Sequence, residues 1–199
     1  MSKSKASIVF ILLFFLVIMP LCANEAFSIG VGASLSYSQD TTVNENLKFN
    51  TDNIAIGLEG RFNIYHLQFD AVGEISVLDS DTLRLAGIPS MGASFELYDV
   101  VKVGLTLGPR IAYIYSNRAK NADELEISNG KNLIEAFKDG PVNVRLMLDV
   151  FAGPVISIGF AYTIPTEFSI NNGNWEALLP SSEGFKNGQF SLSIQMKLF

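Results

Sequence analysis

The stretch FSIGVGASLSYS, residues 27–38, decides the fold of this chain. Its odd positions, from Phe27 to Tyr37, are all apolar, and its even positions are all serine or glycine. Strict alternation along the whole stretch is typical of a β-strand whose two faces meet different surroundings. The sequence therefore predicts a strand here, with one apolar face and one face of small polar residues.

The same alternation returns along the rest of the chain. The further predicted strands carry their apolar positions within residues 54–64, 67–77, 83–97, 101–115, 142–150, 156–164 and 190–198. These apolar positions carry no charge, and none of the regions repeats at the helical period of about 3.6 residues. Pro89 interrupts the region 83–97, where we expect a bulge or bend. The pattern predicts an all-β, eight-stranded fold.

The connections between the predicted strands alternate between short and long. Three are hairpin turns, formed by Tyr65-His66, by residues 98–100 and by residues 151–153, where Gly153 suits a left-handed conformation. The longer loops cover residues 39–53, 78–82, 117–140 and 166–187. Short turns at one end and long loops at the other predict an antiparallel up-and-down order.

Alternation alone does not say which face points outward, because a soluble lipocalin-like barrel and a membrane barrel are inside-out versions of each other. Charged residues make up 17% of the chain, below the ~25% usual for soluble domains. The predicted strands match the ~9–11 residues that a tilted strand needs to cross a bilayer. Aromatic residues gather near the strand ends, as in interfacial girdles: Tyr37, Tyr113, Tyr115, Tyr162, Phe27, Phe62, Tyr65, Phe95 and Tyr98. These features favour a transmembrane β-barrel.

A processing signal precedes the first strand. Two lysines near the start are followed by an apolar run and then by Ala23, a small residue at a cleavage site. We therefore expect a signal peptide over residues 1–23 and an outer-membrane β-barrel domain over residues 24–199. Lipidation of Cys22 is the alternative to plain cleavage.

With eight strands, three short turns, four longer loops, a signal peptide and a C-terminal Phe199, the chain resembles the small outer-membrane barrels of the OmpX, OmpA-transmembrane-domain and OmpW type. The resemblance implies a location in the cell outer membrane, with short periplasmic turns and longer extracellular loops. It also implies contact with outer-membrane lipid and insertion by the barrel-assembly machinery, which reads a terminal aromatic residue such as Phe199.

The face that would line the lumen carries charges of both signs. The first short turn sets Arg61 opposite Asp70, and the second sets Glu96 opposite Lys102. The predicted lumen charge network comprises Glu59, Arg61, Asp70, Glu74, Arg84, Glu96, Lys102, Arg110, Arg145, Asp149 and Lys197. Such a network supports either a gated polar pore or a packed salt-bridge plug. We favour the plug, because an eight-stranded barrel is only wide enough inside for side chains.

The third and fourth long loops carry unusual apolar clusters. Residues 131–139 predict a short helix ended by Gly140, and Asn174 can cap a second helical turn. The candidate contact residues in these loops are Leu133, Ile134, Phe137, Trp175, Leu178, Leu179 and Phe185. They can mark a contact site for lipid, an extracellular ligand or a partner, or they can pack over the barrel mouth.

Residues able to support catalysis or metal binding are few. The chain has one histidine, His66, and one cysteine, so we expect neither a catalytic pair nor a metal site built from these residue types. His66 lies in a predicted short turn and is interpreted as a turn residue. Asp79 and Asp81 are interpreted as a solvated acidic turn rather than a cation site. A net charge of -6 argues against nucleic-acid binding.

The sequence therefore predicts an integral outer-membrane barrel without enzymatic activity or a cofactor, whose loops carry its specificity. The alternative is a narrow passive channel for small, hydrophobic molecules. An outer-membrane enzyme and a secreted soluble barrel that binds a lipophilic ligand are the weaker hypotheses.

Overall fold

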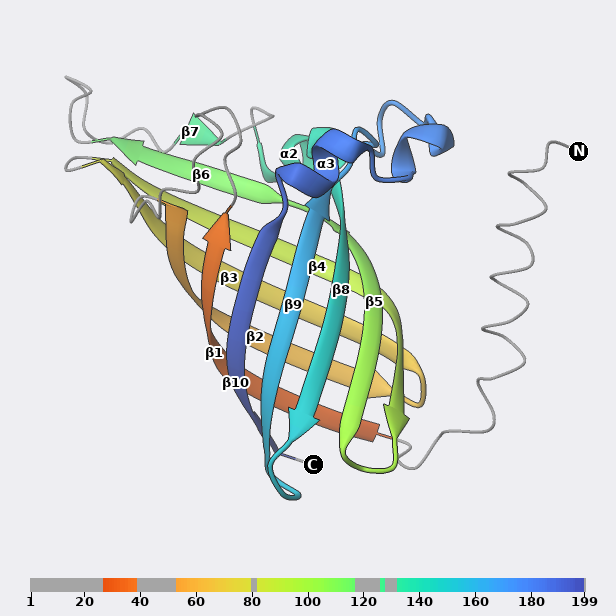
Figure 1. The fold of residues 1–199 in the computed structure, drawn as a ribbon. Coiled ribbons are helices and arrows are strands. Elements are labelled where there is room, and N and C mark those ends of the chain that lie inside the picture. Colours follow the sequence, from red (N-terminus) through yellow and green to blue (C-terminus); the bar gives the residue numbers. More distant parts are fainter. Residues whose placement is uncertain (1–26, 39–52, 80–81, 117–125, 128–131, 199) are drawn as a thin grey trace, which may run out of the picture.

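The computed structural model describes residues 27–38, 53–79, 82–116, 126–127 and 132–198. The predicted signal peptide, Asp81 and Phe199 lie outside the described residues. The strands are β1 Phe27–Ser38, β2 Ile54–Ile64, β3 Leu67–Asp79, β4 Thr82–Leu97, β5 Val101–Pro109, β6 Ile111–Ser116, β7 Glu126–Ile127, β8 Val142–Phe151, β9 Ile156–Pro165 and β10 Gln189–Lys197. The helices are α2 Leu133–Asp139, η3 Trp175–Leu178 and α3 Ser182–Lys186 (Figure 1).

The strands close into an antiparallel barrel. Neighbouring wall strands pair along the chain, and the sheet closes where β3 pairs with β4. β5 and β6 pair with β4 in one continuous register, from Leu97 opposite Val101 to Thr82 opposite Ser116. They therefore form one wall strand with a break, and β7 adds a short pairing to β6. Counted this way, the described residues form the eight-stranded barrel that the sequence predicts.

The break between β5 and β6 falls at two prolines. The register of β4 against β5 and β6 puts Pro89 opposite Pro109. Proline has no backbone N–H, so neither residue donates a hydrogen bond to the other. The bulge expected at Pro89 is absent from β4, whose pairing with β3 keeps its register there. The two prolines interrupt the partner strand instead.

Two short turns fix the registers that the sequence predicts. Tyr65 has a φ of 50° in the β2–β3 turn, and Tyr98 and Asp99 have φ values of 54° and 56° in the β4–β5 turn. As predicted, the pairing sets Arg61 opposite Asp70. The second turn sets Glu96 opposite Lys102, also as predicted.

The third turn lies further along the chain than the sequence predicts. β8 continues to Phe151, and the Ala152 N–H donates to the Ile156 carbonyl at 2.8 Å. The loop therefore spans residues 153–155, and not 151–153. Gly153 has a φ of 87°, the left-handed conformation expected for it. These three turns mark the short-turn end of the barrel, and α2, η3 and α3 mark its loop end (Figure 1).

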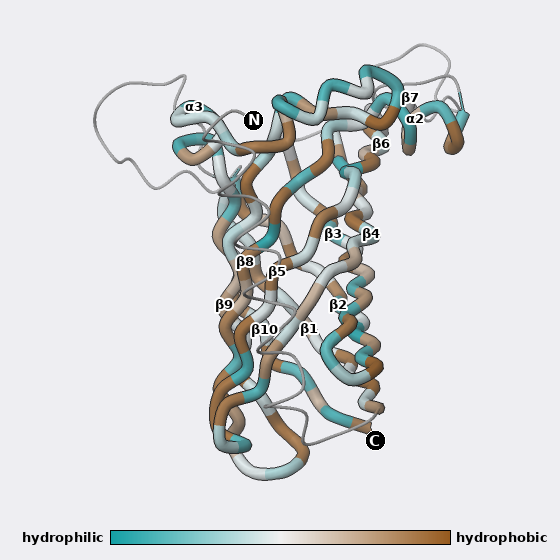
Figure 2. Tube along the Cα trace, turned by 90° about the vertical axis from the view of Figure 1, so that its right-hand side faces the viewer, coloured by the Kyte–Doolittle hydropathy of each residue, from teal (hydrophilic) through white to brown (hydrophobic). Residues whose placement is uncertain are grey.

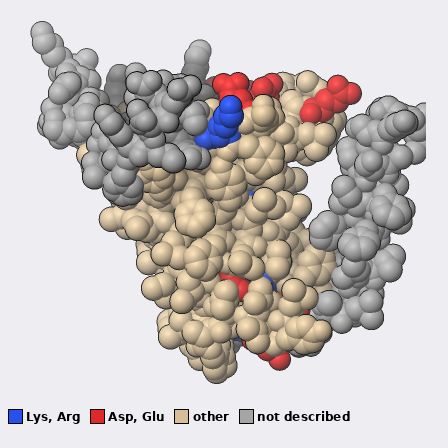
Figure 3. Space-filling view, viewed as in Figure 1, with Lys and Arg blue, Asp and Glu red and all other residues tan. Residues whose placement is uncertain are grey.

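The apolar face of the barrel points outward. Leu58 and Ile56 are 72% and 67% exposed, whereas Glu59, Gln68 and Thr106 on the other face are buried. Figure 2 shows hydrophobic and hydrophilic residues alternating along the strands. In the space-filling view of Figure 3, charged side chains gather at the ends of the molecule and the flank between them is almost free of them. This arrangement is the one expected of a barrel surrounded by lipid.

Among the described residues, the helices are too short or too polar to cross a membrane as helices.

Candidate functional site

Arg61 is the centre of a buried charge cluster in the lumen. From β2, its guanidinium contacts Glu59 and Asp70 at 2.9 Å each, and its Nη1 donates to Asp149 Oδ2. All four residues are buried, with exposed fractions of 6% or less. Each of the three carboxylates lies on a lumen-facing position, because β-strand side chains alternate between the two faces.

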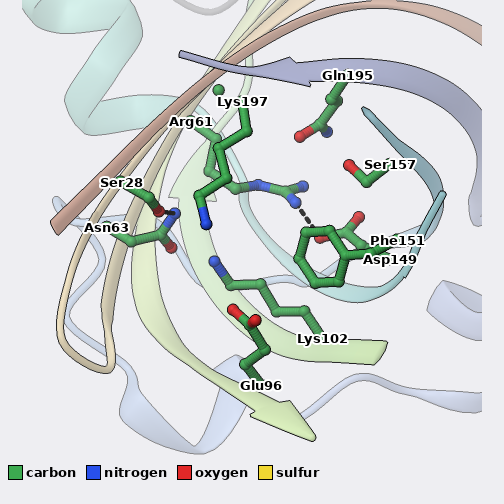
Figure 4. Close-up of a pocket in the computed structure, with 11 residues that line it drawn as sticks. Ser28, Arg61, Asn63, Glu96, Lys102, Asp149, Phe151, Ser157, Gln195 and Lys197 are labelled. Atoms are coloured by element: carbon green, nitrogen blue, oxygen red, sulfur yellow. Dashed lines mark hydrogen bonds and ion pairs between the residues drawn. The ribbon is translucent and has the colours of Figure 1, made fainter. Parts of the chain in front are cut away.

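Two of the ion pairs cross the lumen. β2 and β8 are separated by three wall strands in both directions around the barrel, so they face each other. Arg61 on β2 reaches Asp149 on β8, as Figure 4 shows. In the opposite direction, Arg145 on β8 reaches Glu59 on β2, with Nη2 3.1 Å from Oε1. We call these four residues the lumen bridge. It joins opposite walls of the barrel through two reciprocal salt bridges.

Two uncharged side chains complete the packing around the lumen bridge. The Gln68 amide donates to Asp70 at 2.9 Å, and both Gln68 and Arg61 approach the Met147 sulfur at 3.4 Å. Sequence reasoning did not single out Gln68 or Met147. Met147 had a signal, because it is a large apolar residue on the polar face of its strand. Val72 and Ile88 are likewise large apolar residues on the polar face of their strands, and both are buried.

A second cluster surrounds Glu74 on the loop-end side of the lumen bridge. Its carboxylate accepts hydrogen bonds from Ser36 at 2.8 Å and Gln189 at 2.7 Å, and lies 3.4 Å from Arg110. These partners come from β1, β10 and the β5–β6 junction. Arg84 donates to Ser76 at 3.1 Å on the adjacent strand. The cluster therefore ties wall strands together across the lumen.

The short-turn end of the lumen contains the remaining predicted charges. In the paired strands Lys102 lies between Glu96 and Asp149. Lys197 lines the same pocket, and Figure 4 shows its side chain among these residues. The cavity that they line has a volume of about 30 Å³, room for no more than a few water molecules. Side chains therefore leave only a narrow space at this end of the lumen.

His66 is packed as part of its turn. The residue is 8% exposed. Its ring Nδ1 lies 3.3 Å from the Ser94 carbonyl, and the ring stacks on Phe95 with centroids 5.2 Å apart. The Ser94 hydroxyl donates to Asn63 instead, at 3.3 Å. The contacts of the imidazole with Ser94 and Phe95 are those of a structural residue. In the described part of the chain, no group of three or more His, Cys, Asp or Glu side chains is arranged to hold a metal ion.

Two of the loop helices lie where the sequence predicts them, although α2 begins at Leu133 rather than at residue 131, and α3 was not predicted. Asn132 Oδ1 accepts from the Glu135 N–H at 2.9 Å to cap α2, and the Gly140 N–H closes the helix on the Ala136 carbonyl at 2.8 Å. Asn174 Oδ1 accepts from the Glu176 N–H at 3.3 Å to cap η3. Of the candidate contact residues, Leu178 is half-buried and the others are exposed: Leu133, Ile134, Phe137, Trp175, Leu179 and Phe185.

At the loop end, part of the outward face of the barrel is covered. Tyr162 Oη, on the outward face of β9, donates to the Phe185 carbonyl of α3. Ile164, two residues further along the same face, is 1% exposed. A Cβ at Gly184 would lie 2.5 Å from the Pro165 carbonyl oxygen, so the absence of a side chain lets α3 approach β9 closely. α3 therefore packs against the outside of the barrel wall.

An eight-stranded antiparallel barrel with an apolar exterior and paired charges inside is a membrane-spanning β-barrel. It resembles the small eight-stranded barrels of outer membranes. No family model matches the chain, and no curated protein matches it.

Several solved structures are similar to this chain. The attachment invasion locus protein Ail of Yersinia pestis is 12% identical, with 86% of this chain and 97% of that chain covered and a TM-score of 0.46. The Neisserial surface protein A is 10% identical, with 87% and 96% covered and a TM-score of 0.46. A de novo designed transmembrane β-barrel is 11% identical, with 88% and 99% covered and a TM-score of 0.45.

Proposed function

We propose that this protein is a non-enzymatic outer-membrane barrel whose lumen is closed by ion pairs and whose loops make its external contacts. The observation that carries the proposal is the lumen bridge, in which Arg61 and Arg145 each pair with a carboxylate on the opposite wall. A side chain that is held from both walls of an eight-stranded barrel leaves little room for a permeating molecule.

A location in a lipid bilayer is supported by the closure of the sheet. A sheet in lipid must close to pair its backbone groups, and this sheet closes through β3 and β4. The proposed signal peptide, cleaved after Ala23, would export the chain, and Phe199 would present the terminal aromatic residue to the assembly machinery.

The loops supply the surface on which a ligand or partner would bind. Their exposed apolar residues lie outside the barrel core, on α2, on η3 and in the segment that follows. A barrel of this kind serves envelope structure or surface contact, and its lumen chemistry serves stability.

Single-channel recording in planar lipid bilayers tests the closed lumen. We expect the refolded protein to give no discrete openings, because the lumen bridge spans the interior. A variant in which all four bridge residues, Glu59, Arg61, Arg145 and Asp149, are replaced by alanine should conduct if it folds. The matched control is Leu58→Ala on the outward face, which should stay silent. Reproducible openings of the unaltered protein would instead support the narrow passive channel.

A further inference from the structure

We infer that the helical segment 175–186 lies in the membrane interface at the loop end and binds lipid acyl chains against Trp175, Leu179 and Phe185. The inference rests on the membrane-spanning barrel and extends the proposed surface contact to one partner, the surrounding lipid. It does not depend on whether the lumen is closed.

The first support is the position of α3 along β9. The outward residues Ile156, Ile158 and Phe160 of β9 are exposed, and the exposed face ends at Tyr162 and Ile164, which α3 covers. β9 spans ten residues, about the length of a tilted strand that crosses the hydrocarbon core. Its loop-end residues therefore lie at the boundary of that core, and the helix that covers them lies at the same depth.

The second support is the chemistry of the surface that α3 and η3 leave uncovered. Trp175, Leu179 and Phe185 are 73%, 59% and 50% exposed. Phe168, itself buried, holds the Trp175 ring from one side with centroids 5.0 Å apart. An aromatic and aliphatic surface held at this depth is typical of interfacial anchors.

The third support is continuity with the lipid-facing wall. Phe160 on β9 and Phe190 on β10 are exposed next to each other on the outward face, with ring centroids 6.5 Å apart. Phe160 lies two residues from Tyr162 on β9, and Phe190 pairs with Tyr162 across the β9–β10 register. Tyr162 is the residue that hydrogen-bonds to α3. Charged side chains gather on the upper rim in Figure 3 rather than on the flank below it. The apolar wall therefore continues as far as α3. The helical segment combines its apolar residues with the exposed charges Glu176, Glu183 and Lys186, as an amphipathic interfacial helix does.

The single tryptophan of the chain makes the inference testable, because Trp175 is the only source of tryptophan fluorescence. The protein is refolded into vesicles of phosphatidylcholine, with and without bromine atoms near the glycerol end of the acyl chains. We expect blue-shifted emission, loss of roughly half the intensity with brominated lipid, and weak quenching by aqueous acrylamide.

Two variants calibrate the measurement. Trp175→Phe combined with Phe160→Trp moves the reporter to the lipid-facing wall, where brominated lipid should quench it strongly. Leu179→Ser combined with Phe185→Ser keeps the backbone hydrogen bond from Tyr162 but removes the apolar surface, and should lower the lipid quenching of Trp175.

The possible outcomes separate the alternatives. Strong acrylamide quenching without lipid quenching would show that the segment faces water and would overturn the inference. Protection from both quenchers would show that a protein, such as a second copy, covers it, and would also overturn it. Failure of the Phe160→Trp reference to respond to brominated lipid would instead contradict the membrane-spanning barrel itself.

Discussion

Arg61 on β2 and Asp149 on β8 form an ion pair between opposite walls of the barrel, although 88 positions separate them in the chain. The Arg145–Glu59 pair runs back from β8 to β2. Glu59 Oε1 lies 2.9 Å from Arg61 and 3.1 Å from Arg145, so one carboxylate oxygen links the two crossing pairs. The lumen bridge therefore acts as a coupled unit, and its parts should not contribute independently to stability.

Replacement of Arg61 by alanine should lower the free energy of unfolding by ~3–5 kcal/mol, because it leaves three carboxylates buried without their shared cation. The loss in Arg61→Ala combined with Asp70→Ala should be smaller than the sum of the two single losses. Urea unfolding in detergent measures this double-mutant cycle. Leu58→Ala serves as the control and should show no coupling to Asp70. Simple additivity of the Arg61 and Asp70 effects would contradict the pair.

Glu59→Gln should also destabilise the barrel, because it places a neutral amide between two buried guanidinium groups. The expected loss is ~3 kcal/mol or more, since a buried ion pair is broken while both cations remain. The matched control is Glu176→Gln on the exposed η3 helix, which should be nearly neutral. Equal unfolding midpoints for the two variants would mean that Glu59 does not hold the two arginines.

Gly108→Ala and Gly73→Ala should differ sharply although both add one methyl group to a strand. A Cβ at Gly108 would lie 1.9 Å from the Pro89 carbonyl oxygen, whereas a Cβ at Gly73 would meet no described atom within 4 Å. We expect Gly108→Ala to cost ~1–3 kcal/mol through the forced separation of β4 and β5. Thermal unfolding of both variants measures the difference. Similar midpoints would show that the strands approach less closely at the two prolines.

Sodium carbonate extraction of membranes should leave the protein in the pellet, because its outward face is apolar along the barrel wall. An unboiled sample should also migrate differently from a boiled one on a detergent gel, since a closed barrel has no free sheet edge at which unfolding begins. Recovery in the soluble fraction would contradict the transmembrane barrel.

The sequence by itself determined the strands, their order and two of the three hairpin registers. Alternation at a period of two is a local property of each strand, and a short turn sets which residues face each other across it. The pairing of Arg61 with Asp70 could therefore be predicted. The third turn was misplaced because Val150 and Pro154 are separated by a plausible three-residue loop, and alternation does not choose between adjacent turn positions.

Only the tertiary structure decided which charges meet across the lumen and where the loop helices lie. The Arg61–Asp149 and Arg145–Glu59 pairs depend on how far each strand slides along its neighbour when the sheet closes, which is a property of the whole ring of strands. The position of α3 depends on contacts between Tyr162 and Phe185, and on the close approach that Gly184 allows. Neither arrangement has a signature within one strand or one turn, because each joins segments that meet only after the barrel has formed.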